Sequence, residues 1–190
     1  MAIAGDWIKP IKGRSRTLSG PIALVYAATA IFFSCWYLYT SGFGLVSTET
    51  NRGFYLMLTS VLVFLLFPAL PTSPKTRPSL FDLVWIVAAF VSVGYWMDQY
   101  VDYAINRVSD PNQWDFWMGV IGIVVMLETS RRVLGVTVVI IALVFLAQLY
   151  FGQYLPGKLA HSGLGVTRIV EFTFSTQEAM FGVVAATFAT

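Results

Sequence analysis

The sequence has few charges, one cysteine and one histidine, and each scarcity excludes a class of protein. Only 12% of the 190 residues are charged and 57% are hydrophobic, whereas soluble domains contain about 25% charged residues. We therefore expect an integral membrane protein. Cys35 has no second cysteine with which to form a disulfide bond or a cysteine-rich metal site. A net charge of +2 is too small to indicate nucleic-acid binding.

The sequence also lacks the patterns of catalysis and secretion. It contains no serine–histidine–aspartate constellation, phosphate-binding loop or metal-ligand cluster, so we predict no catalytic, cofactor or metal site. The first 20 residues have neither the apolar core nor the cleavage pattern of a signal peptide. Intramembrane hydrolysis would require a nucleophile with a base, or paired carboxylates deep in the membrane. We therefore expect that the protein is not an enzyme.

Long apolar runs between the charges predict an all-α integral membrane protein. A helix needs about 20 mostly apolar residues to cross a bilayer, and about five segments satisfy this condition. An incomplete sixth apolar segment begins near Ile169, and we expect further chain to complete it or a partner to cover it. The predicted organisation is an interfacial segment, a helix bundle, a periplasmic loop and the start of a further membrane segment. These parts cover 1–19, 20–152, 153–168 and 169–190, with helices at 20–41, 53–71, 80–104, 114–131 and 133–152.

The placement of lysine and arginine predicts the orientation of the helices. Cytoplasmic loops carry an excess of these residues. Strict alternation puts eight of them on one side and four on the other, so we expect a cytoplasmic N-terminus in a bacterial inner membrane. Aromatic clusters at the outer ends of the first and third spans and at the start of the fourth are typical of the membrane interface. The eight are Lys9, Lys12, Arg14, Arg16, Lys75, Arg77, Arg131 and Arg132, and the four are Arg52, Arg107, Lys158 and Arg168.

Glu128, Arg131 and Arg132 are the first candidate functional residues. Their spacing of three and four positions puts the carboxylate beside both guanidinium groups on one helix face. A carboxylate near the hydrocarbon boundary is costly unless cations neutralise it. The simpler interpretation is that the arginines anchor the cytoplasmic end of the helix. The functional interpretation is a docking or coupling point against a second domain.

Asp98 and Asp102 are weaker candidates, because their spacing of four places both near the outer end of one helix. Such a pair binds a cation or relays protons, or it simply faces water beside Arg107. The outer loop at 153–165 is a candidate periplasmic contact surface, since it combines a turn signal with two permissive glycines. The residues singled out in and just after this loop are Pro156, Gly157, Lys158, His161, Gly163 and Arg168.

An ordered series of motifs in the second half of the chain resembles a transporter family. The series begins with Asp115 and Gly119 and continues with Leu127-Glu-Thr-Ser-Arg-Arg-Val-Leu-Gly135. Leu155-Pro-Gly-Lys-Leu-Ala-His-Ser-Gly163 and Ser175-Thr-Gln-Glu-Ala-Met-Phe-Gly182 follow. This order resembles the front part of the fused permeases of tripartite ATP-independent periplasmic (TRAP) transporters, TAXI type. The chain would cover the small membrane domain and the start of the large one.

The resemblance implies a function and a set of partners. Such permeases are similar to secondary transporters in which a small scaffold flanks a large transport domain that contains the substrate and ion sites. A periplasmic solute-binding protein delivers an organic-acid-type substrate, and a sodium or proton gradient supplies the energy. We therefore expect a membrane scaffold without the transport site. The alternative is a shortened relative that serves as an accessory subunit of another inner-membrane complex.

Overall fold

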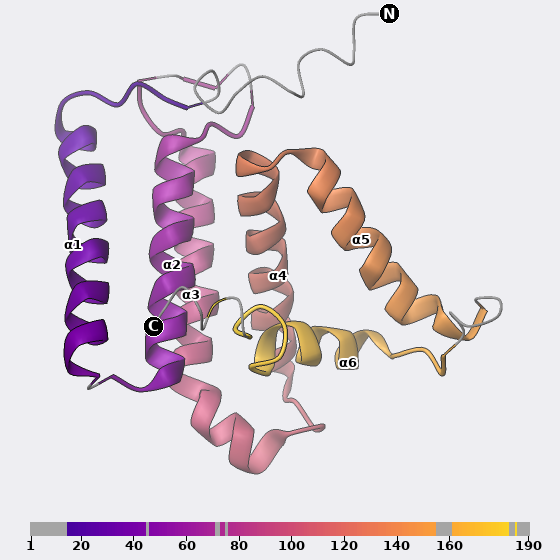
Figure 1. Cartoon of the computed structure of the whole chain (residues 1–190). Helices are drawn as coiled ribbons and strands as arrows, with labels where there is room; N and C mark the ends of the chain where they lie inside the picture. The colour runs from indigo at the N-terminus through magenta and orange to yellow at the C-terminus, as the bar shows by residue number, and fades with distance from the viewer. Residues whose placement is uncertain are drawn as a thin grey trace, which may run out of the picture.

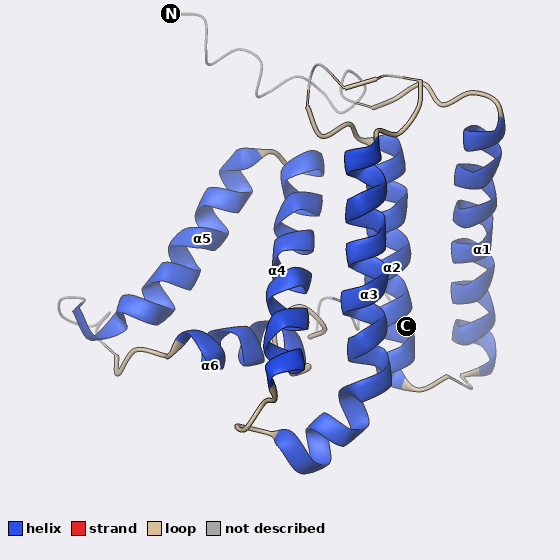
Figure 2. Ribbon diagram, turned by 180° about the vertical axis from the view of Figure 1, so that it is seen from behind, coloured by secondary structure: helices blue, strands red, loops and turns tan. Residues whose placement is uncertain are grey.

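The structure, a computed structural model, describes residues 15–44, 46–70, 73–74, 76–154, 161–182 and 185. These residues form helices and loops, with no strand among them. The helices are α1 (Pro21–Phe43), α2 (Thr48–Leu66), α3 (Leu80–Asp102), α4 (Gln113–Val133), α5 (Val136–Phe151) and α6 (Val166–Val170). In Figures 1 and 2, α1, α2, α3 and α4 lie side by side, α5 leans away from them and the short α6 lies across the bundle. Shorter turns extend three of them, namely η2 (Tyr103–Arg107), η3 (Gly152–Tyr154) and η5 (Glu171–Ser175).

All five long helices predicted from the apolar runs are present, and α2 is the one that is displaced. It begins at Thr48, five residues before the predicted start, because Ser47 is an extended N-cap residue and Glu49 lies in the first turn. It ends at Leu66 because Phe67 precedes Pro68 and is extended, as a following proline requires. Arg52 is therefore inside the helix instead of at its boundary.

Capping interactions fix where α3 and α4 begin. The Ser79 hydroxyl accepts the Asp82 N–H, and the Asp82 carboxylate accepts the Ser79 N–H. Asn112 and Asp115 form the same reciprocal pair at the start of α4. Each box satisfies backbone donors that the first turn leaves unpaired. Between α4 and α5, Gly135 has a φ of 93°, a backbone angle that other residues rarely adopt.

The two ends of the bundle differ in charge. The starts of α1, α3 and α5 and the ends of α2 and α4 lie together at the top of Figure 1. Among the described residues, this basic end carries four arginines and two carboxylates. The opposite, acidic end carries three arginines and seven carboxylates. Because the starts of α1, α3 and α5 lie beside the ends of α2 and α4, successive helices alternate in direction, as the placement of the charges predicts.

Three helices are long and apolar enough to cross a membrane, by length and composition. They are α1, α3 with its extension to Arg107, and α5 with its extension to Tyr154. These helices agree with a multi-pass membrane protein. The helices α2 and α4 have 19 and 21 residues and carry two and four charged side chains, respectively. Their crossing of the bilayer remains a prediction.

The core lies between α2, α3 and α4. One cluster packs Leu56 and Met57 against Val93 and Trp96, and a second packs Phe64 against Ala89 and Val125. By contrast, α5 has no buried residue and α1 has only Thr40. The long apolar faces of α1 and α5 are thus available to lipid or to other helices.

The segment after the outer loop folds back onto this core. The prediction of a sixth membrane segment concerns 169–190, of which 169–182 and 185 are described. In that part, η5 and the turn after it pack against α3 and α4. Two of the expected interface aromatics, Trp96 and Tyr103, are consequently buried beneath this segment. Trp114 and Trp117 remain exposed, as an aromatic belt requires.

Candidate functional site

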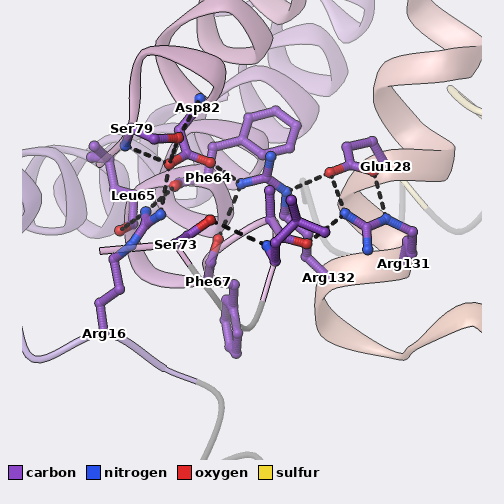
Figure 3. Close-up of polar contacts among 12 residues, drawn as sticks. Arg16, Phe64, Leu65, Phe67, Ser73, Ser79, Asp82, Glu128, Arg131 and Arg132 are labelled. Carbon is purple, nitrogen blue, oxygen red and sulfur yellow. Dashed lines mark hydrogen bonds and ion pairs between the residues drawn. The ribbon is translucent and has the colours of Figure 1, made fainter. Parts of the chain in front are cut away.

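A buried ion-paired cluster joins the helices at the basic end (Figure 3). The Asp82 carboxylate binds Arg16 through Oδ2, 2.6 Å from Nη2, and Arg132 through Oδ1, 2.5 Å from Nη1. All three side chains are fully buried, with an exposed fraction of 0%. The three residues come from the segment before α1, from α3 and from α4. We call Arg16, Asp82, Glu128, Arg131 and Arg132 the basic-end cluster.

Glu128 completes this cluster in the way its spacing predicts. Its Oε1 accepts Arg132 Nε at 2.8 Å, and its Oε2 accepts Arg131 Nε at 2.7 Å. The carboxylate therefore pairs with both arginines on one face of α4, near the helix C-terminus, where cations are favoured. The pairing expected from the sequence is present, and a docking role for these residues remains a proposal.

Backbone carbonyls at the end of α2 accept further guanidinium donors of Arg16 and Arg132. Arg16 Nη1 donates to the carbonyl oxygens of Phe64 and Leu65 at 3.0 and 3.1 Å. Arg132 Nη1 donates to Phe67 O at 3.1 Å, and its guanidinium lies over the Phe64 ring, 4.7 Å from the centroid. The last carbonyls of a helix have no partner within it. The arginines supply those partners and so fasten α2 to α3 and α4.

The sequence analysis missed Arg16 and Asp82 as members of this cluster. Asp82 carries a signal, since a serine three residues before it forms a capping pattern that marks a helix start. A carboxylate used there at a membrane boundary needs a cation. Nothing in the sequence indicates that Arg16, 66 positions away, supplies it. The contact depends on the packing of three separate segments.

A second ion-paired site lies at the acidic end and involves Asp102 but not Asp98. Arg107 Nη1 lies 3.0 and 2.9 Å from the two carboxylate oxygens of Asp115, and Tyr95 Oη donates to Asp115 at 2.8 Å. Asp102 is exposed and pairs with Arg107 at 3.0 Å. Asp98 is exposed and accepts a hydrogen bond from Gln99. The structure thus gives each aspartate a different partner.

Glu171 is a buried carboxylate that ties the folded-back segment to α3. It accepts the Tyr103 hydroxyl at 2.5 Å, the Ser109 N–H at 2.6 Å and Arg168 Nη1 at 2.5 Å. Burial by itself raises the pKa of Glu171, but these donors stabilise the ionised form more, so its pKa lies below the ordinary value. Arg168, a candidate contact residue, is half exposed and paired with this carboxylate.

Close packing and one further polar contact hold the same segment in place. Phe174 and Val170 lie over Gly119 and Gly122 of α4. The Trp96 and Phe181 rings stack with centroids 3.6 Å apart, and Trp96 Nε1 donates to Ser175 O at 3.1 Å. A cavity lined by Trp96, Phe174 and Asp115, among others, has a volume of about 10 Å³, room for about one water molecule.

His161 and Gly163 stabilise the end of the outer loop. The His161 Nδ1 accepts the Gly163 N–H at 3.1 Å, so the proton is on Nε2, which lies 3.2 Å from Gln148 O. Gly163 has a φ of 66°. These contacts join the loop to α5 and give the histidine a structural role. The other loop candidates, Pro156, Gly157 and Lys158, lie outside the described residues.

Comparison of the chain with protein-family models, with curated proteins and with solved structures finds no match. The resemblance to TRAP permeases therefore depends on the motifs alone. In the part of the chain that the structure describes, no group of three histidine, cysteine, aspartate or glutamate side chains is placed to hold a metal ion. The proposed function is therefore based on the geometry of the basic-end cluster and of the ion-paired site at the acidic end.

Proposed function

We propose that the chain is the scaffold portion of a TRAP-type secondary transporter for organic-acid-like solutes. In this role it holds a larger transport domain at a fixed depth in the bacterial inner membrane, and the solute and ion sites belong to that larger domain. The observation that carries the proposal is the buried pairing of Arg16 and Arg132 with Asp82. A scaffold must resist the displacement of its partner, and this pairing fixes three segments to one another.

The buried carboxylates among the described residues form ion pairs within the fold, which favours a scaffold role over a solute-transport site. At the basic end, Asp82 and Glu128 are each paired with arginine side chains. At the acidic end, Asp115 is paired with Arg107 and Glu171 with Arg168. A solute carboxylate would have to displace Asp82 to pair with the fully buried Arg16. The cavity near Asp115, at about 10 Å³, is too small for an organic acid.

The outer surfaces of α1 and α5 support a position inside a larger membrane assembly. Both helices are apolar, and α5 has no buried residue. Such faces contact lipid or the small and apolar faces of other helices. The same exposure favours the alternative role of an accessory subunit in another inner-membrane complex. In the transporter, a periplasmic solute-binding protein would approach the acidic end.

The identity of the partners tests the proposal. The polypeptide that contains this chain is extracted from its native membrane in mild detergent, and every co-purifying chain is identified by mass. A many-span transport domain, on the same or another polypeptide, together with a periplasmic solute-binding protein supports the scaffold role. Companions of a redox or pigment-binding kind contradict it and favour the accessory-subunit role.

A transport measurement adds a second test. Vesicles that contain the complex are given a sodium or proton gradient, and uptake of labelled organic acids is measured. Asp82→Asn is expected to lower the amount of assembled complex and uptake in proportion, because it weakens the scaffold without touching a solute site. A fall in solute affinity with unchanged assembly would instead place Asp82 in the transport pathway.

A further inference from the structure

The basic-end cluster has more positive than negative charge. Three guanidinium groups face two carboxylates, which leaves a formal charge of +1. Backbone carbonyls solvate the arginines but add no formal charge. Arg132 Nη2 is buried and has no hydrogen-bond partner among the described residues. Uncompensated charge near hydrocarbon is costly, so the cluster favours an anion beside it.

Arg131 is the member of the cluster that an external anion reaches. Its side chain has an exposed fraction of 32%, whereas Arg16 and Arg132 are fully buried. Its Nε and Nη2 are fixed by Glu128 and by Ala69 O at 2.9 Å. Its Nη1 has no partner among the described residues. The guanidinium is therefore held in one orientation with a free pair of N–H donors.

Apolar side chains flank this exposed guanidinium. Leu134, the C-cap residue of α4, lies three positions after Arg131 on the same side of the helix and has an exposed fraction of 62%. Leu70 follows the residue whose carbonyl binds Arg131 and has an exposed fraction of 57%. Beyond Leu134, α5 leaves α4 at an angle and buries none of its side chains (Figure 1). Exposed apolar side chains of Leu70, Leu134 and α5 thus follow closely in sequence on the residues that hold this cationic donor.

We propose that an anionic phospholipid binds at Arg131. Its phosphate oxygens accept the free Nη1 donors, and its acyl chains lie along Leu134 and the exposed side of α5. The lipid charge of −1 matches the +1 of the cluster, and the apolar flank distinguishes a lipid from a free phosphate ion. Basic pockets on the cytoplasmic side of membrane proteins bind acidic headgroups in the same way. The proposal does not depend on the transporter function.

Lipid retention measured by native mass spectrometry tests this site. The full chain is purified in detergent with a mixture of phosphatidylglycerol and phosphatidylcholine, and lipid adducts are counted. We expect the wild type to retain phosphatidylglycerol preferentially and Arg131→Gln to retain at least tenfold less of it. The matched control is Arg168→Gln, which removes another partly exposed arginine with a carboxylate partner three residues away. Equal retention by wild type and Arg131→Gln would overturn the site.

A second measurement on the unaltered protein covers the case in which Arg131→Gln fails to fold. The wild type is placed in phosphatidylcholine nanodiscs with increasing phosphatidylglycerol, and its unfolding temperature is followed. A saturable rise supports a specific lipid site, and no rise contradicts it. Inorganic phosphate is added in a parallel series. An equal rise with phosphate alone would show a free-anion site and refute the lipid proposal.

Discussion

Gly122 of α4 and Phe174 of η5 are so close that only a glycine fits at position 122. A Cβ atom there would overlap the Phe174 ring, and one at Gly119 would lie 2.5 Å from Val170 Cγ1. Phe174 is almost completely buried, with an exposed fraction of 1%. The two glycines, one helical turn apart, form the surface on which the segment after the outer loop packs.

Gly122→Ala should therefore displace this segment. Inserting an atom into a close-packed contact costs about 1–3 kcal/mol, so we expect a lower unfolding temperature in detergent. The matched control is Gly94→Ala on α3, where nothing lies within 4 Å of the added Cβ. That substitution should stabilise the protein by about 0.4–1 kcal/mol. Equal unfolding temperatures for Gly122→Ala and the wild type would show that the segment is not docked on α4.

Removal of the Asp82 charge should be among the most damaging single changes. Asp82→Asn leaves Arg16 and Arg132 buried without their shared anion. Breaking a buried pair in this way costs about 3–5 kcal/mol, so the folded yield in fluorescence-detected gel filtration should fall sharply. Asp98→Asn, which alters an exposed carboxylate on the same helix, should change stability by less than about 0.5 kcal/mol. A wild-type profile for Asp82→Asn would refute the cluster as a source of stability.

The stability that Glu171 contributes should depend on pH. Its pKa is lowered in the fold by Tyr103, Arg168 and the Ser109 N–H, despite its burial. The stabilisation is therefore complete above the pKa of the unfolded chain, about 4.3, and is lost as the pH falls through the lower folded value. Unfolding temperatures of wild type and Glu171→Gln should differ at pH 7 and converge toward strongly acidic pH. A difference that stays constant with pH would contradict this account.

The sequence predicts what depends on neighbouring residues and misses what depends on packing. The five long helices follow from apolar runs, and the Glu128 pairs follow from helical spacing. Asp82 and Arg16 meet only because the ends of α2, α3 and α4 converge. Such a contact has no local signature in the sequence.

The aromatic residues near the acidic end illustrate the same limit. Hydropathy places Trp114 and Trp117 at the membrane interface, and both side chains are exposed. It places Trp96 there too, although this indole is buried under Phe181 and donates to Ser175 O. The difference arises because the segment that covers Trp96 is short and returns to the bundle at a position that hydropathy does not encode.

The predicted orientation is open to a direct test, because Cys35 is the sole cysteine. In a Cys35→Ala background, single cysteines replace Arg77 at the basic end and Asp110 at the acidic end, both exposed. If the basic end is cytoplasmic, a membrane-impermeant maleimide should label Asp110→Cys in intact cells and Arg77→Cys only after permeabilisation. The reverse pattern would place the N-terminus outside. It would also put the acidic end inside, so the position assigned to the solute-binding protein would be wrong.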